Sequence, residues 1–529
     1  MTGADARKYF STDGSVFAVT PAIIVYPRNE NDVRKTTRFT WQLAERGRII
    51  PITARGGGTD QSGAAIGSGI ILAFSAHLNK IVEFDSKSGV IATQPGINYG
   101  KLQQTVNMHY RFIPPYPSSI EYSTIGGAVA NNASGEKTIK YGSTRDYVRG
   151  LRVVLANGEV IETKRISKRE LNKKLGLSTF EGEIYRALDA LLEENSQLVD
   201  GLALNVTKNS AGYALNEVKQ KNGSFDLTPL FVGSQGTLGI ITEVILDTEP
   251  LNPNTTLIAA SFDDMQLAEE VILELRKLPE TPSAMEMIDE NLLKFVQKHN
   301  PSHITGVIAE PFPKIMLLIE LDNPSDRVQR RMVKKVTKLL NKYQVQHTVE
   351  HDAAKKEELW KLRHSSAIVM AHTDGNARAL PIIEDGIVPV DRFKDYITAV
   401  YELFAKHGLQ VAVWGHAGDS NLHLQPFLDL SQVGDRQKVF RLIDEYYNLV
   451  INLGGSTSGE HNDGRLRGPY LTQLYGADTV TLFKNLKKAF DPYGTLNPGI
   501  KAEATLEDAK ATLRHEYSLD QLYQHLPRT

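Results

Sequence analysis

The stretch Ile49-Ile50-Pro51-Ile52-Thr53-Ala54-Arg55-Gly56-Gly57-Gly58-Thr59-Asp60 determines the fold prediction, because a strand-like run leads into three consecutive glycines. Glycine has no Cβ, so the backbone N–H groups of such a loop can surround an anion such as a pyrophosphate. The loop fits neither the G-x-G-x-x-G dinucleotide pattern nor the G-x-x-x-x-G-K-[ST] pattern of P-loop NTPases. Taken alone, it predicts either another kind of anion site or a simple tight turn.

Two further segments with little side-chain bulk favour the first interpretation. Residues 124–135 read TIGGAVANNASG, with strand character at the centre, and residues 233–240 read GSQGTLGI. Three such segments indicate that backbone from several places approaches one large ligand, with three independent turns as the alternative. The surrounding sequence predicts an α+β sheet domain. Its expected elements are strands at 22–26, 49–53, 69–74, 81–85 and 89–93, and a helix capped by Asn29 or Asn31 that runs to about Glu45.

The second half of the chain predicts a different sheet. Two strand-then-helix units recur, at 257–262 with 266–278 and at 315–320 with 326–343. This spacing fits helices packed on an antiparallel sheet. From Asp478 to Leu526 the pattern is mostly helical.

Three of the 14 histidines lie in two glycine-flanked loops of this second half. His416 and His423 flank the turn of a predicted hairpin, with strands at 411–414 and 422–427, and Glu460-His461 follow in a later loop. Two imidazoles and a carboxylate can hold a divalent metal and leave positions open for a substrate. His416, His423 and Glu460 are therefore candidate ligands, with His461 as a non-ligating base. The alternative is that these histidines are ordinary buried residues.

The composition excludes several classes of function. The 529 residues include 60 basic and 62 acidic side chains, a net charge of −2 that gives no general attraction to nucleic acid or an anionic membrane. Cysteine is absent, which excludes disulfides, thiolate catalysis, Cys-ligated iron–sulfur clusters and cysteinyl flavin. The N-terminus has no secretory pattern, and no apolar run approaches the roughly 20 residues of a membrane span. We expect a cytoplasmic protein, with peripheral attachment at the inner face of the membrane as an open option.

Residues 160–225 contain a charge cluster. Six basic side chains between Lys164 and Lys174 precede an acidic helical stretch at 181–200. We expect a solvated helical insertion, and the alternative is a docking patch for an anionic partner or a membrane surface.

The glycine-rich segments resemble the flavin-binding domain of the vanillyl-alcohol-oxidase/p-cresol-methylhydroxylase (PCMH) superfamily, over about residues 18–252. The segments that carry the resemblance are TPAIIVYP at 20–27, RGGGTD at 55–60, QPG at 94–96, PPYP at 114–117 and KNSAGY at 208–213. The resemblance implies non-covalent FAD, because Thr59 and Asp60 stand where some members attach FAD through a histidine. Gln235 departs from the glutamate of many members. The implied FAD contacts are Arg55, Gly56, Gly57, Gly58, Thr59, Asp60, Pro95, Gly96, Pro117, Ser118, Thr124, Gly126, Gly127, Asn131, Ala133, Gly135, Tyr141, Gly142, Gly236, Thr237, Gly239, Ile240, Ile241 and Asn497.

Residues 410–468, with DPYGTLNPG at 491–499, resemble the substrate domain of FAD-linked D-2-hydroxyacid dehydrogenases. This group includes D-lactate dehydrogenases, D-2-hydroxyglutarate dehydrogenases and the glycolate oxidase flavoprotein subunit. The patterns GHxGDGNLH and SGEHGDG are met, except that Ser420 and Asn462 each replace a glycine. The resemblance implies a zinc or manganese ion held by His416, His423 and Glu460, with His461 as catalytic base. It also implies substrate contacts at Asn421 and at Arg363 of the LWKLR segment, whose guanidinium suits a carboxylate.

These resemblances together predict an α+β chain of three parts. They are a PCMH-type FAD-binding domain at 1–252, a substrate (cap) domain with antiparallel sheet and helices at 253–475, and a C-terminal helical segment at 476–529 that packs back on the FAD domain. The implied reaction is oxidation of a D-2-hydroxyacid, with D-lactate to pyruvate as the first choice. Arg363 would hold the carboxylate, the metal would lower the pKa of the hydroxyl, and His461 would take its proton as hydride passes to flavin N5.

Several alternatives stay open at this point. D-2-hydroxyglutarate and glycolate are the next substrates, and from other classes the chain could be a metal-dependent hydrolase or a non-catalytic flavin-binding subunit. The expected partners are a small 2-hydroxyacid and an external electron acceptor, either quinone or a redox protein, since the chain has no cysteine for an iron–sulfur relay. Nucleic acid is not expected, and a homodimer and a peripheral membrane contact are open options.

Overall fold

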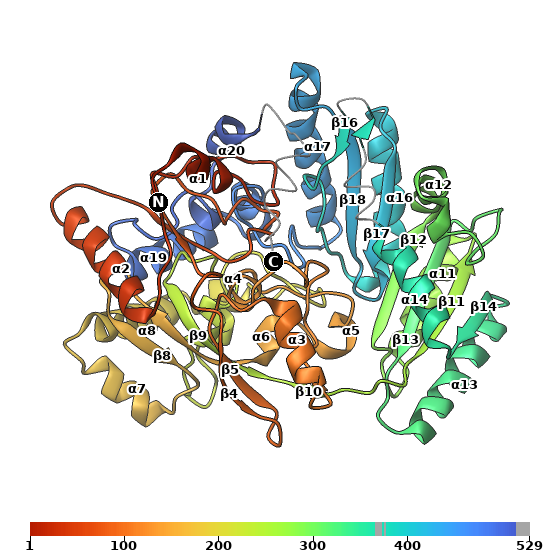
Figure 1. Ribbon diagram of the computed structural model, residues 1–529, viewed down its shortest axis with the longest axis horizontal. Coiled ribbons are helices and arrows are strands. Elements are labelled where there is room, and N and C mark those ends of the chain that lie inside the picture. The colour runs from red at the N-terminus through yellow and green to blue at the C-terminus, as the bar shows by residue number, and fades with distance from the viewer. Residues whose placement is uncertain (366–372, 375–376, 515–529) are drawn as a thin grey trace.

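The computed structural model describes residues 1–365, 373–374 and 377–514. Within these residues, helices and mostly antiparallel sheets form the predicted α+β architecture (Figure 1). The first 250 residues contain a small parallel sheet in the order β1-β3-β2, a larger antiparallel sheet in the order β4-β5-β9-β7-β8, and the short pair β6-β10. Their strands are β1 (Ile23–Val25), β2 (Ile52–Arg55), β3 (Ile70–Ala73), β4 (Ile81–Asp85), β5 (Val90–Thr93), β6 (Arg111–Phe112), β7 (Val148–Val154), β8 (Val160–Thr163), β9 (Ile240–Asp247) and β10 (Glu249–Pro250).

The burial of each strand matches its place in the sheet. All four residues of the central strand β3 are buried, as expected for a continuous apolar run with neighbours on both sides. Edge strand β4 has only half-buried and exposed side chains. The predicted strand at 81–85 is confirmed to the residue, and the others are confirmed with ends shifted by one to three residues.

Ten helices surround these two sheets in the described residues. They are α1 (Ala4–Tyr9), α2 (Glu30–Ala44), α3 (Tyr99–Asn107), α4 (Ile125–Asn131), α5 (Thr138–Tyr141), α6 (Thr144–Tyr147), α7 (Lys168–Leu175), α8 (Phe180–Glu194), α9 (Ser196–Asp200) and α10 (Thr228–Phe231). Asn29, the first of the two predicted caps, accepts the N–H of Asp32 at the start of α2. The strand character assigned to the centre of 124–135 is wrong. Thr124 caps a helix there, α4, and Asn132 ends it in the left-handed conformation.

An eight-stranded antiparallel sheet dominates the second half of the chain. Its order is β14-β11-β13-β12-β17-β18-β16-β15. Its strands are β11 (Thr256–Phe262), β12 (Ala284–Asp289), β13 (Ile315–Leu321), β14 (Gln346–Glu350), β15 (Thr373–Asp374), β16 (Ala377–Ala379), β17 (Val411–His416) and β18 (Asn421–Leu428). Its helices are α11 (Met265–Arg276), α12 (Glu290–His299), α13 (Asp326–Lys342), α14 (Ala353–His364), α16 (Phe393–Lys406) and α17 (Val433–Asn452). Both predicted strand–helix units are confirmed.

Helices cover both faces of this sheet. The buried side chains of α11, α13, α16 and α17 share one hydrophobic cluster with β11 and β13, and those of α12 and α14 share another with the opposite face. Each fully buried aliphatic side chain in these layers contributes about 1.5–3 kcal/mol by burial. The layers hold β12, β17 and β18 rigidly at the sheet centre, where the histidines lie.

The segment after residue 470 returns to the first half. Its helices are α18 (Leu471–Tyr475), α19 (Ala477–Phe490) and α20 (Leu506–Thr512), and residues 515–529 of the predicted helical stretch lie outside the described residues. Phe483, Leu486 and Phe490 of α19 share a buried cluster with Ile184 and Leu188 of α8. Among the described helices, none combines the length and hydrophobicity that a bilayer span requires.

Candidate active site

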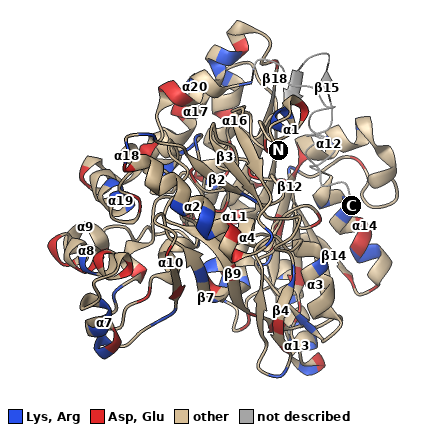
Figure 2. Cartoon of the chain, turned by 60° about the vertical axis from the view of Figure 1, so that its left-hand side comes forward, with Lys and Arg blue, Asp and Glu red and all other residues tan. Residues whose placement is uncertain are grey.

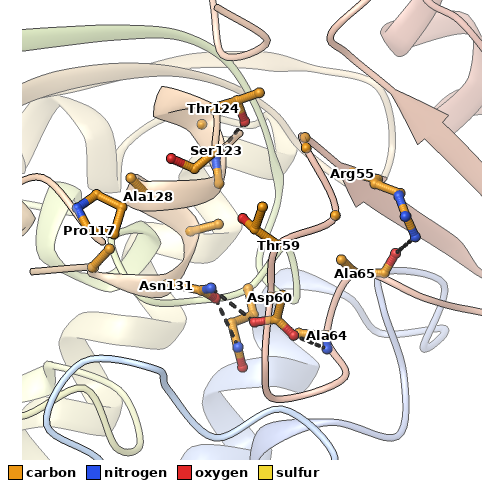
Figure 3. Close-up of a pocket in the computed structure, with 18 of the residues that line it drawn as sticks. Arg55, Thr59, Asp60, Ala64, Ala65, Pro117, Ser123, Thr124, Ala128 and Asn131 are labelled. Atoms are coloured by element: carbon orange, nitrogen blue, oxygen red, sulfur yellow. Dashed lines mark hydrogen bonds between the residues drawn. The ribbon is translucent and has the colours of Figure 1, made fainter. Parts of the chain in front are cut away.

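A cavity that is partly open to solvent lies where the three glycine-rich segments meet (Figure 3). Residues of the loop at 55–60, of the segment at 123–134 and of the segment at 235–241 all line it, an extent that suits a ligand as large as a dinucleotide, and we call it the flavin-sized cavity. Its walls consist largely of backbone and small side chains. The predicted flavin contacts that line it are Arg55, Gly56, Gly57, Gly58, Thr59, Asp60, Pro95, Pro117, Ser118, Thr124, Gly126, Gly127, Asn131, Ala133, Gly236, Gly239 and Ile241.

The glycine loop packs tightly against the segment before α4. A Cβ at Gly57 would collide with the carbonyl of Tyr122, and a Cβ at Gly56 would collide with the side chain of Thr124. These glycines are therefore required for the loop to approach its neighbour, whatever the cavity binds.

Substitution of Gly57 should weaken the binding of flavin in the cavity. We expect Gly57→Ala to displace the loop, because overpacking of this kind costs about 1–3 kcal/mol, and to lower the flavin bound per chain by about tenfold or more. The measurement is the flavin absorbance per chain after purification. Gly434→Ala is the matched control, since a Cβ there meets no atom within 4 Å. Full flavin content in Gly57→Ala would remove the loop from the binding site.

Two charged residues of the loop hold it in place through hydrogen bonds to neighbouring segments. The Arg55 guanidinium points away from the cavity in Figure 3 and donates to the carbonyls of Thr12 (2.8 Å) and Ala65 (3.3 Å). The Asp60 carboxylate accepts the N–H of Ala64 (2.7 Å) and the side-chain amide of Asn131 (2.9 Å). Arg55 thus lines the cavity, as the other residues of the loop do, but does not direct its charge into it.

The other predicted flavin contacts do not line this cavity. They are Gly96, Gly135, Tyr141, Gly142, Thr237, Ile240 and Asn497. The Tyr141 hydroxyl instead donates to Asp322 (2.8 Å), and Gly142 lines a separate cavity. The Asn497 amide donates to the carbonyls of Ala64 (2.9 Å) and Gln235 (2.8 Å), so it supports two wall segments from outside.

The three predicted metal ligands come together at one end of the cavity. The Glu460 Oε1 atom lies 3.1 Å from His416 Nε2 and 3.3 Å from His423 Nε2, and the two Nε2 atoms are 3.4 Å apart. Ligands about 2.0–2.1 Å from a tetrahedral zinc ion are about 3.3–3.4 Å from one another. This donor triangle therefore fits a zinc-sized ion.

Two buried glutamates orient the histidines of this triangle. The Nδ1 atom of His416 lies 2.7 Å from Glu286, and the Nδ1 atom of His423 lies 3.3 Å from Glu384. A carboxylate on Nδ1 fixes the imidazole so that Nε2 is free for a metal. Sequence reasoning missed both glutamates, although Glu286 stands between Met285 and Met287 in strand β12, an unusual place for a carboxylate.

His461 lies beside the triangle and on the wall of the flavin-sized cavity. Its Nδ1 atom is 2.8 Å from the nearer oxygen of Glu384, and its Nε2 atom is 3.7 Å from Glu460. Burial lowers the pKa of His461, but the charges of Glu384 and Asp385 outweigh it and raise the pKa to about 9. Glu384 therefore holds the Nδ1 side of His461 and leaves Nε2 on the cavity side.

Two domain models match this chain. They are the FAD binding domain, over residues 21–164, and the C-terminal domain of FAD linked oxidases, over residues 251–500. The chain therefore carries an FAD-binding domain followed by the C-terminal domain of FAD linked oxidases. The structure of p-cresol methylhydroxylase with substrate bound is similar to this chain with a TM-score of 0.67 at 16% identity, covering 96% of this chain and 94% of that one. The predicted PCMH-type fold is confirmed.

Three curated relatives are similar to this chain over most of its length. D-2-hydroxyglutarate dehydrogenase of Escherichia coli is 29% identical over 94% of this chain, which spans only about half (50%) of that protein. Glycolate oxidase subunit GlcD of Bacillus subtilis is 29% identical over 90% of this chain and 88% of that protein. D-lactate dehydrogenase of Anaerostipes hadrus is 27% identical over 85% and 84%.

A second group of acidic and imidazole side chains lies beside the first. Glu384, Asp385, His423 and His461 also lie within ligand distance of one another. However, fully buried Arg467 forms an ion pair with Glu384. The Asp385 carboxylate accepts the backbone N–H groups of Glu460 and His461. These partners fill the oxygens, so the group positions the neighbouring ligands and base.

The Arg467–Glu384 pair should dominate local stability. We expect Arg467→Met to lower the free energy of unfolding by about 3–5 kcal/mol, because it leaves a buried carboxylate without its cation. The measurement is urea unfolding of the purified chain. Arg392→Met is the control: it breaks the exposed Arg392–Asp395 pair, which contributes about 0–1 kcal/mol. Equal losses in the two variants would contradict a structural role for the buried pair.

The two predicted substrate contacts occupy different places. Arg363 is buried at the end of α14, and its Nε and Nη2 atoms donate to Glu286 at 2.9 and 2.8 Å. The same Glu286 carboxylate contacts His416. Asn421 is fully buried behind the histidines, and its amide donates to Asp385 and to the carbonyl of Gly386 (3.2 Å each). Asn421 therefore supports the loop, and its predicted contact with a substrate stays a prediction.

Buried Lys208 is another residue that sequence reasoning did not place at this site. It comes from the KNSAGY segment, which served only as a sign of flavin binding. Its Nζ atom lies 2.6 Å from Glu460 Oε2 and 3.0 Å from the Ser134 hydroxyl. The charges of Lys208 and His416 outweigh burial and hold the pKa of Glu460 well below its usual range. Glu460 therefore stays ionised, as a metal ligand must.

The departures from the family patterns have structural explanations. Ser420, Asn462 and Gln235 all adopt positive φ, between 53° and 66°, which explains why glycine is the usual residue at the first two positions. The Asn462 amide donates to the carbonyls of Asn131 (3.0 Å) and Gly233 (2.9 Å), and so joins two cavity walls. The Gln235 amide donates to Asn131 as well, at 3.0 Å.

Proposed function

We propose that this chain oxidises a D-2-hydroxyacid to a 2-oxoacid with non-covalent FAD as the electron acceptor. The observation that carries the proposal is that Glu460 and His461 lie on the wall of the same cavity as the glycine loop at 56–58. A metal-ligand group, a candidate base and a flavin-sized cavity therefore meet at one place. The test is whether a D-2-hydroxyacid bleaches the flavin of the purified protein without oxygen.

The residues at the site fit both groups that this reaction needs. The triangle of His416, His423 and Glu460 matches the donor spacing of a divalent ion, zinc or manganese. The cavity walls at 56–60 and 124–133 leave backbone exposed for a large cofactor. When bound, FAD supplies the acceptor of two electrons, and the metal supplies a positive charge that lowers the pKa of a nearby hydroxyl.

The side chains account for the proton and the carboxylate of the substrate. In its neutral form, which its raised pKa of about 9 makes predominant only at alkaline pH, His461 takes the hydroxyl proton at Nε2, because Glu384 holds its Nδ1 side. Arg363 supplies the cation for the substrate carboxylate. Its contacts with Glu286 use two of the five N–H donors of the guanidinium, so the others are available for this role.

Within this class, D-lactate is the first substrate to test, followed by D-2-hydroxyglutarate and glycolate. The names of the relatives support this set without ranking its members, and the chain spans only half of the D-2-hydroxyglutarate dehydrogenase it resembles. The external acceptor that takes the electrons from the reduced flavin is proposed to be a quinone or a redox protein. These 529 residues contain no cysteine that could hold an iron–sulfur relay. The cytoplasmic location and the homodimer stay predictions.

A further inference from the structure

Helix α13 carries a continuous basic face on the outside of the eight-stranded sheet. One carboxylate, Asp326 at its first position, accompanies seven cations, although the chain as a whole has a net charge of −2. Six of the seven side chains are exposed, and Lys335 is half-buried. The cations are Arg327, Arg330, Arg331, Lys334, Lys335, Lys338 and Lys342.

The opposite face of α13 explains the orientation of these cations. Met332, Val336 and Leu340 are buried against the sheet, so the positions between them face outward. Most of the outward cations follow one another at three- or four-residue intervals, which places them in one row along roughly 23 Å of helix. In the part of the chain that the structure describes, no carboxylate lies within ion-pair distance of any of the seven.

The basic cluster that the sequence singled out, on and before α7, is different. Lys174 pairs there with Glu181 at 2.5 Å, and the Glu170 carboxylate accepts the N–H of Ser167 at the start of the helix. Glu162 is exposed beside Lys164 in the chain. Acidic side chains thus accompany the α7 cluster, whereas Asp326 is the only carboxylate on α13 itself.

The position of α13 separates it from the proposed chemistry. It lies at the outer corner of the second half, far from α4 and the flavin-sized cavity in the centre (Figure 1). In Figure 2 the helix lies at the lower edge of the molecule, where the positions of its Lys and Arg residues are blue. An electron acceptor needs to approach the cofactor, so this face suits attachment rather than electron transfer.

We propose that the outer face of α13 docks the protein on a lipid surface with anionic phosphate headgroups. Clusters of four to eight Lys and Arg side chains on an amphipathic helix bind such surfaces, because each cation near the surface adds attraction. A protein partner normally needs a buried apolar centre with aromatic anchors. Among the described residues, the large exposed hydrophobic side chains all lie outside α13. A flat anionic layer is therefore the partner that fits this row of charges.

The experiment is co-sedimentation of the full chain with vesicles. Wild-type protein should sediment with phosphatidylcholine vesicles that contain phosphatidylglycerol, should not sediment with pure phosphatidylcholine, and should be released by high salt. The variant Arg330→Gln/Arg331→Gln/Lys334→Gln/Lys338→Gln should lower the partition coefficient by about 100-fold or more. The matched control is Lys164→Gln/Arg165→Gln/Lys168→Gln/Arg169→Gln, which removes the same charge from the α7 cluster and should change it by about twofold or less.

Three results would overturn the proposal. The first is a wild-type protein that stays in the supernatant with phosphatidylglycerol vesicles at low salt. The second is an equal loss in the two quadruple variants, which would indicate net charge rather than this face. The third is double-stranded DNA that displaces the protein from vesicles through the same four residues, which would favour nucleic acid. Thermal unfolding and flavin content check that both variants fold, and the outcome does not depend on the proposed reaction.

Discussion

His461→Ala is expected to keep its FAD and its metal but to reduce its flavin about 100- to 10,000-fold more slowly with a D-2-hydroxyacid. The reason is that His461 is the proposed base: it lines the cavity, and its Nδ1 side is held by Glu384. The measurement is rapid mixing of enzyme and substrate without oxygen, followed at the absorbance of oxidised flavin.

The control for this variant is His77→Ala. His77 is an exposed residue after strand β3, far along the chain from the histidine loops. It should bleach at the wild-type rate. A wild-type rate in His461→Ala would make the base assignment wrong, whereas loss of flavin from that variant would indicate a structural role instead.

His423→Ala is expected to lose the metal and keep the flavin. His423 contributes one of the three donors in the triangle but does not line the flavin-sized cavity. Loss of the metal removes several kcal/mol of charge stabilisation, so flavin reduction should slow by about 1,000-fold or more. The measurements are metal content by elemental analysis, flavin content by absorbance, and the rate of bleaching.

The ligand assignment depends on the contrast between these variants. His461→Ala should retain the metal, His423→Ala should lose it, and both should remain yellow. A full complement of metal in His423→Ala would place the ion elsewhere, for example at Glu384 and Asp385. If the metal is lost and the rate is unchanged, the ion has no part in the reaction.

The sequence predicts the local elements of this fold well, because their signals are short-range. The strand at 81–85 and the cap at Asn29 follow from residues within a few positions. The order of the eight-stranded sheet does not, since it pairs β12 with β17 across more than a hundred residues. The centre of residues 124–135 was wrongly predicted as a strand, because a run of alanine and glycine has no periodicity that separates strand from helix. In the structure Thr124 caps a helix there.

The candidate site shows the same division. His416, His423 and Glu460 lie together, and this grouping could be predicted because their loops carry recognisable motifs. Glu286 and Lys208 were missed because only the tertiary fold brings these buried charges to the triangle. Other side chains took supporting roles. The Arg55 guanidinium points away from the cavity and donates to a backbone carbonyl. Asn421 is buried behind the histidines, where its amide also donates to a backbone carbonyl.

The most direct test of the proposed function is anaerobic titration of the purified protein with D- and L-lactate, D-2-hydroxyglutarate and glycolate. The account predicts a yellow protein whose flavin is bleached by at least one of these acids, and by the D- rather than the L-form of lactate if lactate is the substrate. A colourless protein that takes up no added FAD would favour a metal-dependent hydrolase. A yellow protein that none of the acids bleaches would contradict the central claim and indicate a non-catalytic flavin-binding subunit.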